Sequence, residues 1–392
     1  MKIDILTLFP EMFAPVLGTS IIGNAQKNGI VDIKTIQIRD FADNKHNRVD
    51  DYPYGGGNGM VMQAEPISKA IERSKAELVC YLTPKGRPFN QNIAKMLSKQ
   101  KHIAFLCGHY EGIDQRAIDE VVDLEISIGD FVLTGGEIPA MAVVDSVVRM
   151  LPGVLNVEQT EAEESFYNGI LEYPQYTRPE EWVVGDAALG VPKVLLSGNH
   201  AEIEKWRKEK ALEVTKAKRP DLLETKRIGI LGGSFNPVHA GHIDIAQQAM
   251  EHCNLDKVLF IPANVQPHKQ NEKVIENHQR LAMLQIAIND YLNFEVSTME
   301  IDRGGVSYTI ETLRELKKMH SQDEFFFIIG EDCQPEKWND YEEMKKLIEF
   351  VKLPRRIDIS STEIRNGKME NLPTKVAKYM EKNRITFGDE QL

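Results

Sequence analysis

The chain has 392 residues, which is long for one compact core and therefore favours two domains. Hydrophobic residues make up 42% and charged residues 27% of the sequence, as in soluble globular proteins, and no apolar run is long enough to cross a bilayer. A net charge of −12 excludes non-specific nucleic-acid binding over the whole surface, because neutralising phosphates requires a local excess of lysine and arginine. We expect a cytoplasmic protein whose four cysteines are reduced, since they show no CxxC spacing.

The first half of the chain alternates apolar runs with helical patterns. Residues 1–9 predict a short buried strand, and the runs at 78–82 and 103–107 predict two more. A helical pattern covers residues 63–74. This alternation predicts an α/β fold with a parallel sheet.

Four loops rich in glycine or carboxylates lie beside these apolar runs. They are YGGGNGM from Tyr54, GHYEGID from Gly108, SIGDFVLTGGE from Ser127 and FYNGILEYPQYTRP from Phe166. Glycine at such turns permits backbone conformations closed to other residues and lets a ligand approach the main chain. One glycine pair alone would indicate only a turn, so the combination and order of the loops carry the information.

A charged helical stretch follows residue 198 and ends near Pro220. It holds the strongest candidate for an RNA-binding patch, formed by Lys205, Arg207, Lys208, Lys210, Lys216, Lys218 and Arg219. A merely solvated basic helix face explains the same composition equally well. A new strand starts at Arg227, which places a domain boundary between Asp221 and Lys226.

The second half opens with a strand, the turn GGSFNPVHAGH and a helix expected from Ile243. This order favours phosphate binding at a helix N-terminus. His239 and His242 have no cysteine or third histidine nearby, so we predict phosphate contact and no metal site of protein ligands. ISSTEIR, residues 359–365, offers hydroxyls and a guanidinium at another helix start, although a capping box alone would explain SSTE.

Across residues 1–224 the sequence resembles the bacterial tRNA (guanine-N1)-methyltransferases, a family of knotted SPOUT-type enzymes. The matching motifs are LFPEMF, RDF, VDDYPYGGGNGM, CGHYEGID, SIGDFVLTGGEIPA, DSVVRMLPGVL, LEYPQYTRP and VLLSGNHAEI. The resemblance implies a trefoil-knotted domain at 1–160 that binds S-adenosylmethionine, and a small helical tRNA-binding domain at 161–224. It also implies a homodimer.

The activity implied is methylation of guanine N1 at the guanosine next to the anticodon of tRNA, with S-adenosylmethionine as the methyl donor. Glu164 would act as the general base in place of the family's aspartate, and Arg149 would stabilise charge on guanine O6. The expected cofactor contacts are Tyr81, Leu82, Pro84, Gly108, Glu111, Ile128, Leu133, Gly135, Gly136 and Pro139. An RNA-binding protein that has lost the chemistry through the glutamate is the alternative.

The second half resembles the nucleotidylyltransferases, and PANVQPHK, RLAML, SYTIETL and GEDCQPEKW point to nicotinate-nucleotide adenylyltransferase. The resemblance implies a Rossmann-like domain at 225–392 that joins nicotinate mononucleotide to ATP, with Mg²⁺ bridging the phosphates. His239 and His242 would be the catalytic residues. The expected ATP contacts are Gly232, Ser234, Phe235, Lys269, Ser361, Thr362 and Arg365. The expected contacts to the nicotinate substrate are Thr309, Asp332 and Trp338.

The segment before ISSTEIR is shorter than in that family. KLIEFVKLPRRID stands where the resemblance implies two strands and a long loop, so we expect a missing segment that includes central sheet backbone. A domain that lacks central backbone would be weakened, repaired by some rearrangement, or inactive. The alternative is therefore a non-catalytic module that helps the first half to fold, dimerise or position RNA.

Overall fold

The computed structural model describes residues 1–155, 164–166, 169–267, 274–357 and 359–387. The backbone divides into two compact units, of which the first comprises Met1–Leu155, Arg227–Arg314 and Glu324–Leu392. The second comprises Asn156–Lys226 and Glu315–Asp323. No helix among the described residues is both long enough and apolar enough to span a membrane.

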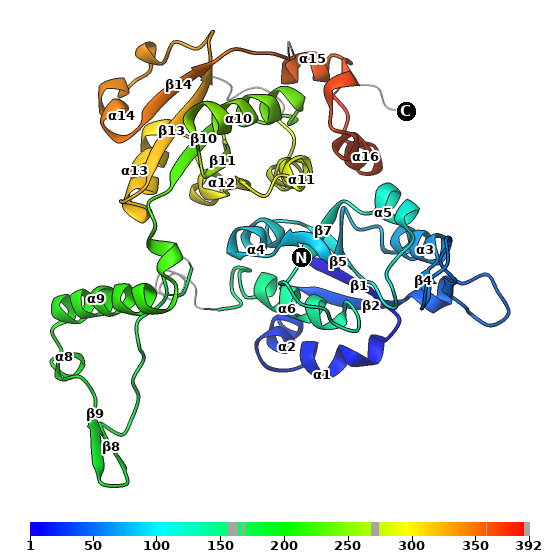
Figure 1. Cartoon of the computed structure of the whole chain (residues 1–392), viewed down its shortest axis with the longest axis horizontal. Coiled ribbons are helices and arrows are strands. Elements are labelled where there is room, and N and C mark those ends of the chain that lie inside the picture. Colours follow the sequence, from blue (N-terminus) through cyan, green and yellow to red (C-terminus); the bar gives the residue numbers. More distant parts are fainter. Residues whose placement is uncertain (156–163, 167–168, 268–273, 358, 388–392) are drawn as a thin grey trace. The chain divides into compact units, whose positions relative to one another are not determined.

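The first unit contains two five-stranded sheets whose strand pairings are all parallel (Figure 1). The order of the first sheet is β2-β1-β6-β5-β7. Its strands are β1 (Lys2–Thr7), β2 (Asp32–Gln37), β5 (Leu78–Pro88), β6 (His102–Cys107) and β7 (Leu124–Ser127). The predicted α/β class and the three predicted strands of this half are confirmed.

Helices cover both faces of the first sheet. Successive strand residues point to opposite sides, so apolar side chains lie on both faces and each face needs a covering layer. Ile3 and Ile5 lie in one core and Leu6 in the other. The core around Leu6 is closed by α3 (Ala64–Ser74), the helix predicted at 63–74, and by α5 (Gln115–Val121). The opposite core is closed by α2 (Ser20–Lys27), α4 (Gln91–Ser98) and α6 (Glu137–Val148). Shorter elements are η1 (Pro10–Met12), α1 (Ala14–Leu17), η2 (Ile38–Phe41), β3 (Asp50–Asp51) and β4 (Val61–Met62).

The second sheet has the order β12-β11-β10-β13-β14, which is the crossover arrangement of a Rossmann-like fold. Its strands are β10 (Arg227–Gly233), β11 (Lys257–Pro262), β12 (Phe294–Val296), β13 (Glu324–Gly330) and β14 (Glu349–Leu353). Its helices are α10 (Ala240–Cys253), α11 (Asn277–Ile288), α12 (Met299–Arg303), α13 (Thr309–Met319), η5 (Pro335–Lys337), α14 (Tyr341–Leu347), α15 (Ser361–Arg365), η6 (Met369–Asn371) and α16 (Thr374–Lys382).

The structure corrects two expectations about this second sheet. The short segment before ISSTEIR does not remove central backbone, because Glu349–Leu353 forms β14 at the sheet edge and pairs with β13. The interior strands β11, β10 and β13 are present and paired on both sides. The helix expected from Ile243 begins earlier, at Ala240, with His239 as its N-cap residue.

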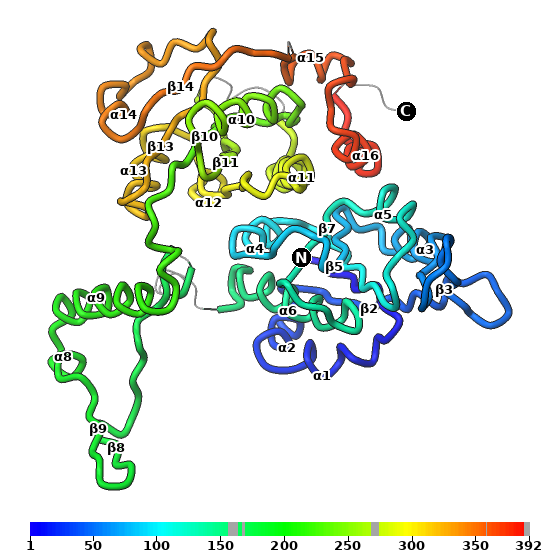
Figure 2. Tube along the Cα trace, in the orientation of Figure 1, coloured from blue at the N-terminus to red at the C-terminus, as the bar shows by residue number. Residues whose placement is uncertain are grey.

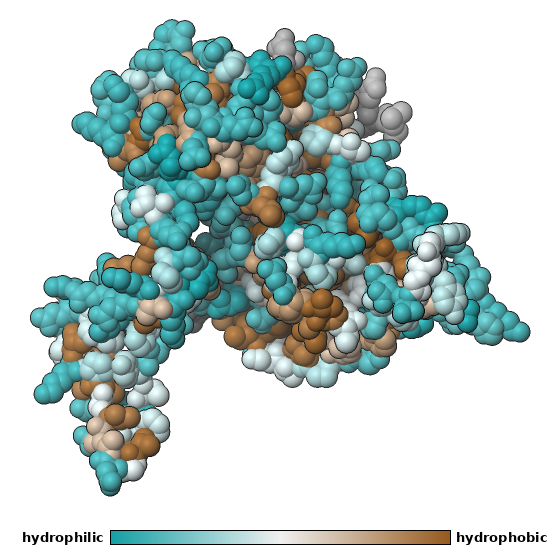
Figure 3. All heavy atoms as spheres, viewed as in Figure 1, coloured by the Kyte–Doolittle hydropathy of each residue, from teal (hydrophilic) through white to brown (hydrophobic). Residues whose placement is uncertain are grey.

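The second unit contains a hairpin and a long helix, which can be followed along the chain in Figure 2. Strands β8 (Glu181–Val184) and β9 (Ala187–Gly190) pair antiparallel, and α8 (Lys193–Leu196), α9 (His200–Lys218) and η4 (Pro220–Leu223) follow. Helix α9 is the predicted charged helix. Figure 3 shows apolar side chains at the surface of the hairpin, where Trp182 and Val183 are more than half exposed.

The cationic patch on α9 is partly neutralised by neighbouring carboxylates. Lys208 lies 2.7 Å from Glu204, and Lys210 lies 2.6 Å from Glu213. Further pairs are Lys205 with Glu209 and Arg219 with Asp221. The solvated-face interpretation therefore accounts for several of the seven predicted RNA-binding cations.

Candidate functional site

A cavity of about 310 Å³ lies where β5, β6 and β7 end, the edge at which parallel α/β sheets bind ligands. It is bounded by the loops from Gly108 and Ser127 that the sequence singled out. All ten residues expected to contact S-adenosylmethionine line it: Tyr81, Leu82, Pro84, Gly108, Glu111, Ile128, Leu133, Gly135, Gly136 and Pro139. The fold thus brings together residues that are up to 58 positions apart in the chain, as the numbers of Tyr81 and Pro139 show.

The shape of this cavity depends on an irregularity in β5. Leu82 and Arg87 both pair with Ile126 of β7, so residues 83–86 leave the ladder and bulge toward the cavity. Gly86 closes the bulge, and a Cβ there would lie 2.3 Å from the Ile126 nitrogen. The bulge therefore requires glycine at its return point.

Glycine also allows the start of α6, which forms another wall of the cavity, to approach the end of β6 closely. A Cβ on Gly136 would lie 2.7 Å from the Cys107 Cα, and the Gly136 N–H donates to the Gly108 carbonyl at 2.9 Å. A Cβ on Gly108 would meet the Tyr81 ring at 2.8 Å. These close approaches leave a space walled mainly by backbone and apolar groups, which suits a nucleoside.

Glu137, in the first turn of α6, was missed by the sequence reasoning. It is 3% exposed, and the Thr7 hydroxyl donates to its Oε1 at 2.8 Å. A carboxylate at a helix N-terminus is favoured by the helix dipole. This contact connects β1 to the start of α6, where Gly135 and Gly136 form the glycine wall of the cavity. The sequence GGE at the start of a helix was the pattern that could have indicated a role for Glu137.

The two residues predicted to perform the methyl transfer fall in different compact units. Arg149 is the C-cap residue of α6 in the first unit, whereas Glu164 belongs to the second unit. Their pairing therefore stays a prediction.

A second cavity, of about 810 Å³, lies at the carboxyl ends of β10 and β13. The predicted residues that line it are Gly232, Ser234, His239, His242, Thr309, Asp332, Trp338, Ser361, Thr362 and Arg365. Lys269 lies outside the described residues. Phe235 is 1% exposed and packs edge-on against His242 with ring centroids 4.9 Å apart, so its side chain supports the loop from beneath.

The two histidines of this cavity are held against each other. Their ring centroids are 3.7 Å apart, and the His239 N–H donates to Nδ1 of His242 at 3.2 Å. Burial, followed by the charge of Arg355, lowers the pKa of His239 to about 4. Burial also lowers the pKa of His242 well below its ordinary value, with His239 and Arg355 adding to the effect. Both imidazoles are therefore neutral hydrogen-bonding groups at neutral pH.

Helix α15 is fixed to the loop that precedes His239 by hydrogen bonds from its side chains to backbone carbonyls. Arg365 Nη1 donates to the Asn236 carbonyl at 2.8 Å, and the Ser361 hydroxyl donates to the Pro237 carbonyl at 3.0 Å. The predicted capping box is confirmed, with Ser360 and Glu363 as its two members. Because Ser360 performs the capping, Ser361 and Thr362 are left at the cavity wall.

Arg355 was also missed by the sequence reasoning. It lines the second cavity, and its Nη2 donates to Oδ2 of Asp332 at 3.0 Å. The pattern that could have indicated this role is the pair of arginines that follows the apolar run of β14 after one proline. Among the described residues, no group of three or more histidine, cysteine, aspartate or glutamate side chains is placed to hold a metal ion.

Comparison with known proteins separates the two halves. Residues 1–225 match the family model described as tRNA (Guanine-1)-methyltransferase TrmD, and residues 230–367 match the model described as Cytidylyltransferase-like. The tRNA (guanine-N(1)-)-methyltransferase of Ruminiclostridium cellulolyticum is 55% identical over 227 residues, which cover 57% of this chain and 96% of the relative. The enzyme of the same name from Clostridium beijerinckii is 59% identical over 225 residues, which cover 57% of this chain and 92% of the relative. Because the first match spans more than half of the 392 residues, this chain belongs to the tRNA (guanine-1)-methyltransferase family.

Proposed function

We propose that the chain transfers a methyl group from S-adenosylmethionine to N1 of the guanosine next to the anticodon of tRNA. The observation that carries this proposal is the convergence of all ten expected cofactor contacts on one cavity of about 310 Å³. The family membership of residues 1–225 also supports it. The loops at Pro84, Gly108 and Pro139 that meet at this cavity would form the trefoil knot of a domain at 1–160.

S-adenosylmethionine supplies an activated methyl group on a sulfonium. Guanine N1 carries a proton and is a poor nucleophile until that proton leaves, so a base must remove it as the new N–C bond forms. Glu164 would accept the proton, and Arg149 would stabilise the negative charge that develops on guanine O6. The target guanine would leave the RNA stack to enter the cavity. The helical domain at 161–224 would bind the tRNA, and the enzyme would act as a homodimer.

The substitution Glu164→Gln tests the role of the base. It keeps the size and hydrogen-bonding capacity of the side chain but removes its ability to accept a proton, so methyl transfer should fall by roughly 10²-fold or more. S-adenosylmethionine binding, measured by calorimetry, should be unchanged. Glu172→Gln, at an exposed carboxylate of the same unit, is the matched control. Wild-type protein that binds tRNA and S-adenosylmethionine without transferring a methyl group would support the RNA-binding alternative.

For the second half we propose adenylyl transfer from ATP to nicotinate mononucleotide. The supporting observations are the neutral histidine pair, the anchoring of α15 beside it, and the intact interior strands of the second sheet. The phosphate of the nucleotide would attack the α-phosphorus of ATP, so that a P–O bond forms as the bond to pyrophosphate breaks. His239, His242 and Arg365 would orient and stabilise the phosphates, and Mg²⁺ bound with the nucleotide would help to neutralise their charge.

Pyrophosphate release by the full chain tests this second activity. We expect release with ATP and nicotinate mononucleotide, and loss of release in His239→Asn. Exchange of ATP for CTP addresses the nucleotide preference, since the matching family model is described as Cytidylyltransferase-like. A full chain that is folded and methylates tRNA but releases no pyrophosphate with either nucleotide would favour the non-catalytic module.

A further inference from the structure

Arg87 belongs to the first sheet but donates hydrogen bonds to carbonyl groups of the second half. Its Nη1 donates to the carbonyls of Ile288 and Tyr291 at 2.9 Å each, and its Nη2 donates to the carbonyl of Phe294. Ile288 ends α11 and Phe294 begins β12. Arg87 is 7% exposed. Its guanidinium thus bonds the last carbonyl of α11 and two carbonyls of the segment that leads from α11 into β12.

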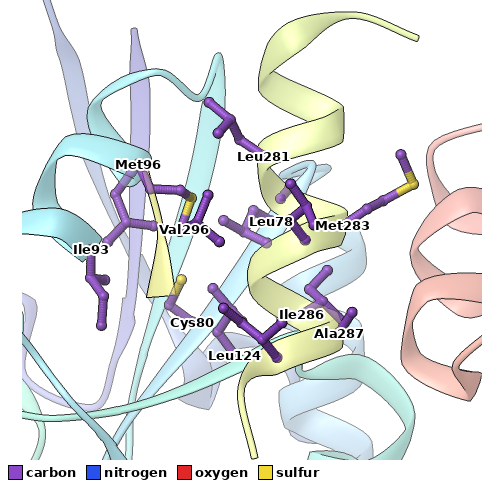
Figure 4. Packing of buried hydrophobic residues seen from close by; sticks show 14 of the residues in the cluster. Leu78, Cys80, Ile93, Met96, Leu124, Leu281, Met283, Ile286, Ala287 and Val296 are labelled. Carbon is purple, nitrogen blue, oxygen red and sulfur yellow. The ribbon is translucent and has the colours of Figure 1, made fainter. Parts of the chain in front are cut away.

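The contact around Arg87 is packed like a protein interior. Figure 4 shows side chains from both halves of the chain in one cluster. The first half contributes Leu78, Cys80 and Leu124 from its sheet and Ile93 and Met96 from α4, and the second contributes Leu281, Met283, Ile286 and Ala287 from α11 and Val296 from β12. Polar pairs lie around this cluster. They include His278 with Glu77 at 3.0 Å, Lys378 with Glu120 at 2.6 Å, and Lys99 with Asp302 at 2.6 Å. Close packing transmits a displacement on one side to the other.

On one side, Arg87 is the end point of the bulge that borders the first cavity. Thr83, Pro84 and Lys85 line the cavity, and the bulge returns to the ladder at Arg87, opposite Ile126. A ligand that orders residues 83–86 therefore also restricts the backbone that carries the guanidinium.

On the other side, α11 reaches the second cavity through Arg280. This side chain is 0% exposed, and its guanidinium donates to the Ser234 carbonyl at 2.6 Å and to the Ala263 carbonyl at 2.7 Å. Ser234 and Ala263 both line the second cavity. Helix α11 is thus held by an arginine from each side, Arg87 at its C-terminal end and its own Arg280 near its N-terminal end.

We propose that Arg87 is a positioning residue that couples the two cavities through α11, so that a ligand in the first cavity stabilises α11 and tightens nucleotide binding in the second. The coupling is reciprocal, because each ligand must change the affinity for the other by the same factor. The inference rests on the proposed function, since it takes S-adenosylmethionine as the ligand of the first cavity and ATP as the ligand of the second.

Hydrogen exchange of the full chain with and without S-adenosylmethionine tests the coupling. In the wild type the ligand should slow exchange both in the cavity loop at residues 108–113 and in α11, the latter by about fivefold or more, the lower range of allosteric coupling. In Arg87→Lys, which keeps the charge but cannot bond three carbonyls at once, protection should persist in the loop and disappear from α11. Lys99→Ala, at an exposed ion pair of the same contact, should behave as the wild type.

A second readout is ATP affinity measured with and without saturating S-adenosylmethionine. We expect about a fivefold or greater increase in affinity in the wild type and no increase in Arg87→Lys.

The outcomes separate the inference from the proposed function. Wild-type protection of the loop without protection of α11 would overturn the coupling while leaving the methyl-donor cavity intact. Absence of protection in both regions would overturn the proposed function and the coupling with it. If α11 is still protected in Arg87→Lys, Arg87 is not the residue that couples the two cavities. The wild-type measurement decides the main point even if the variant folds poorly.

Discussion

The backbone N–H of His239 donates to Nδ1 of His242, and the two rings are in contact, with centroids 3.7 Å apart and planes tilted by 33°. This pairing holds the two imidazoles together at the start of α10, where a helix N-terminus favours anions. Since burial keeps both rings uncharged, the phosphate binding that we propose for them would be hydrogen bonding by neutral groups. The helix N-terminus and Arg365 would supply the positive potential.

The first prediction concerns stability at acid pH. The pKa of His239 is about 4 in the folded chain and about 6.5 when unfolded, so below pH 6.5 the unfolded state binds more protons. The stabilisation is complete above pH 6.5 and is lost as the pH falls toward 4. Urea unfolding should show a loss of roughly 2 kcal/mol from this group between pH 7 and pH 5. In His239→Asn the pH dependence should be correspondingly smaller, and an unchanged dependence would show that the ring is not held neutral.

The second prediction concerns the glycine wall of the first cavity. Gly136→Ala should weaken S-adenosylmethionine binding by at least about tenfold, because the new Cβ would lie 2.7 Å from the Cys107 Cα and must displace backbone that lines the cavity. Calorimetry measures the affinity. Gly190→Ala is the control, since a Cβ there meets no atom within 4 Å. Equal affinities for the two variants would contradict the placement of the cofactor against this wall.

The third prediction concerns the shared core of the first unit. Leu281→Ala should lower the free energy of unfolding by about 2–5 kcal/mol, because the side chain is 0% exposed and its removal leaves a cavity. The loss should appear in probes of both halves, since Leu281 packs in the cluster that joins them. Leu292→Ala, at a residue 66% exposed, should change the stability by less than about 0.5 kcal/mol. Destabilisation confined to the second half would show that the two sheets unfold independently.

The glycine-rich loops that border the first cavity could be predicted from sequence because their signals are local, whereas the individual contact residues followed from the family resemblance. Gly108, Gly135 and Gly136 stand next to apolar runs, and parallel strands bring such loops to one edge of a sheet. The same reasoning failed for the segment before ISSTEIR. Its few apolar residues were interpreted as the remains of two strands, whereas EFVKL is long enough to form a complete edge strand beside β13.

Contacts between distant segments had no comparable signal. Arg87 bonds carbonyls more than 200 positions away, and nothing in its local sequence distinguishes it from an exposed arginine near the end of a strand. The buried state of Arg280 is likewise hidden, because the helix pattern around it indicates an ordinary polar position. Such roles follow from tertiary packing, which fixes where backbone carbonyls remain without partners.

Methyl transfer from labelled S-adenosylmethionine to two matched tRNAs tests the central claim most directly. One tRNA carries guanosine next to the anticodon and the other carries adenosine at that position. We predict that label enters the guanosine form alone and is located at N1 of that base. Absence of label in both forms, with tRNA and S-adenosylmethionine shown to bind, would contradict the account and leave the first half as an RNA-binding module.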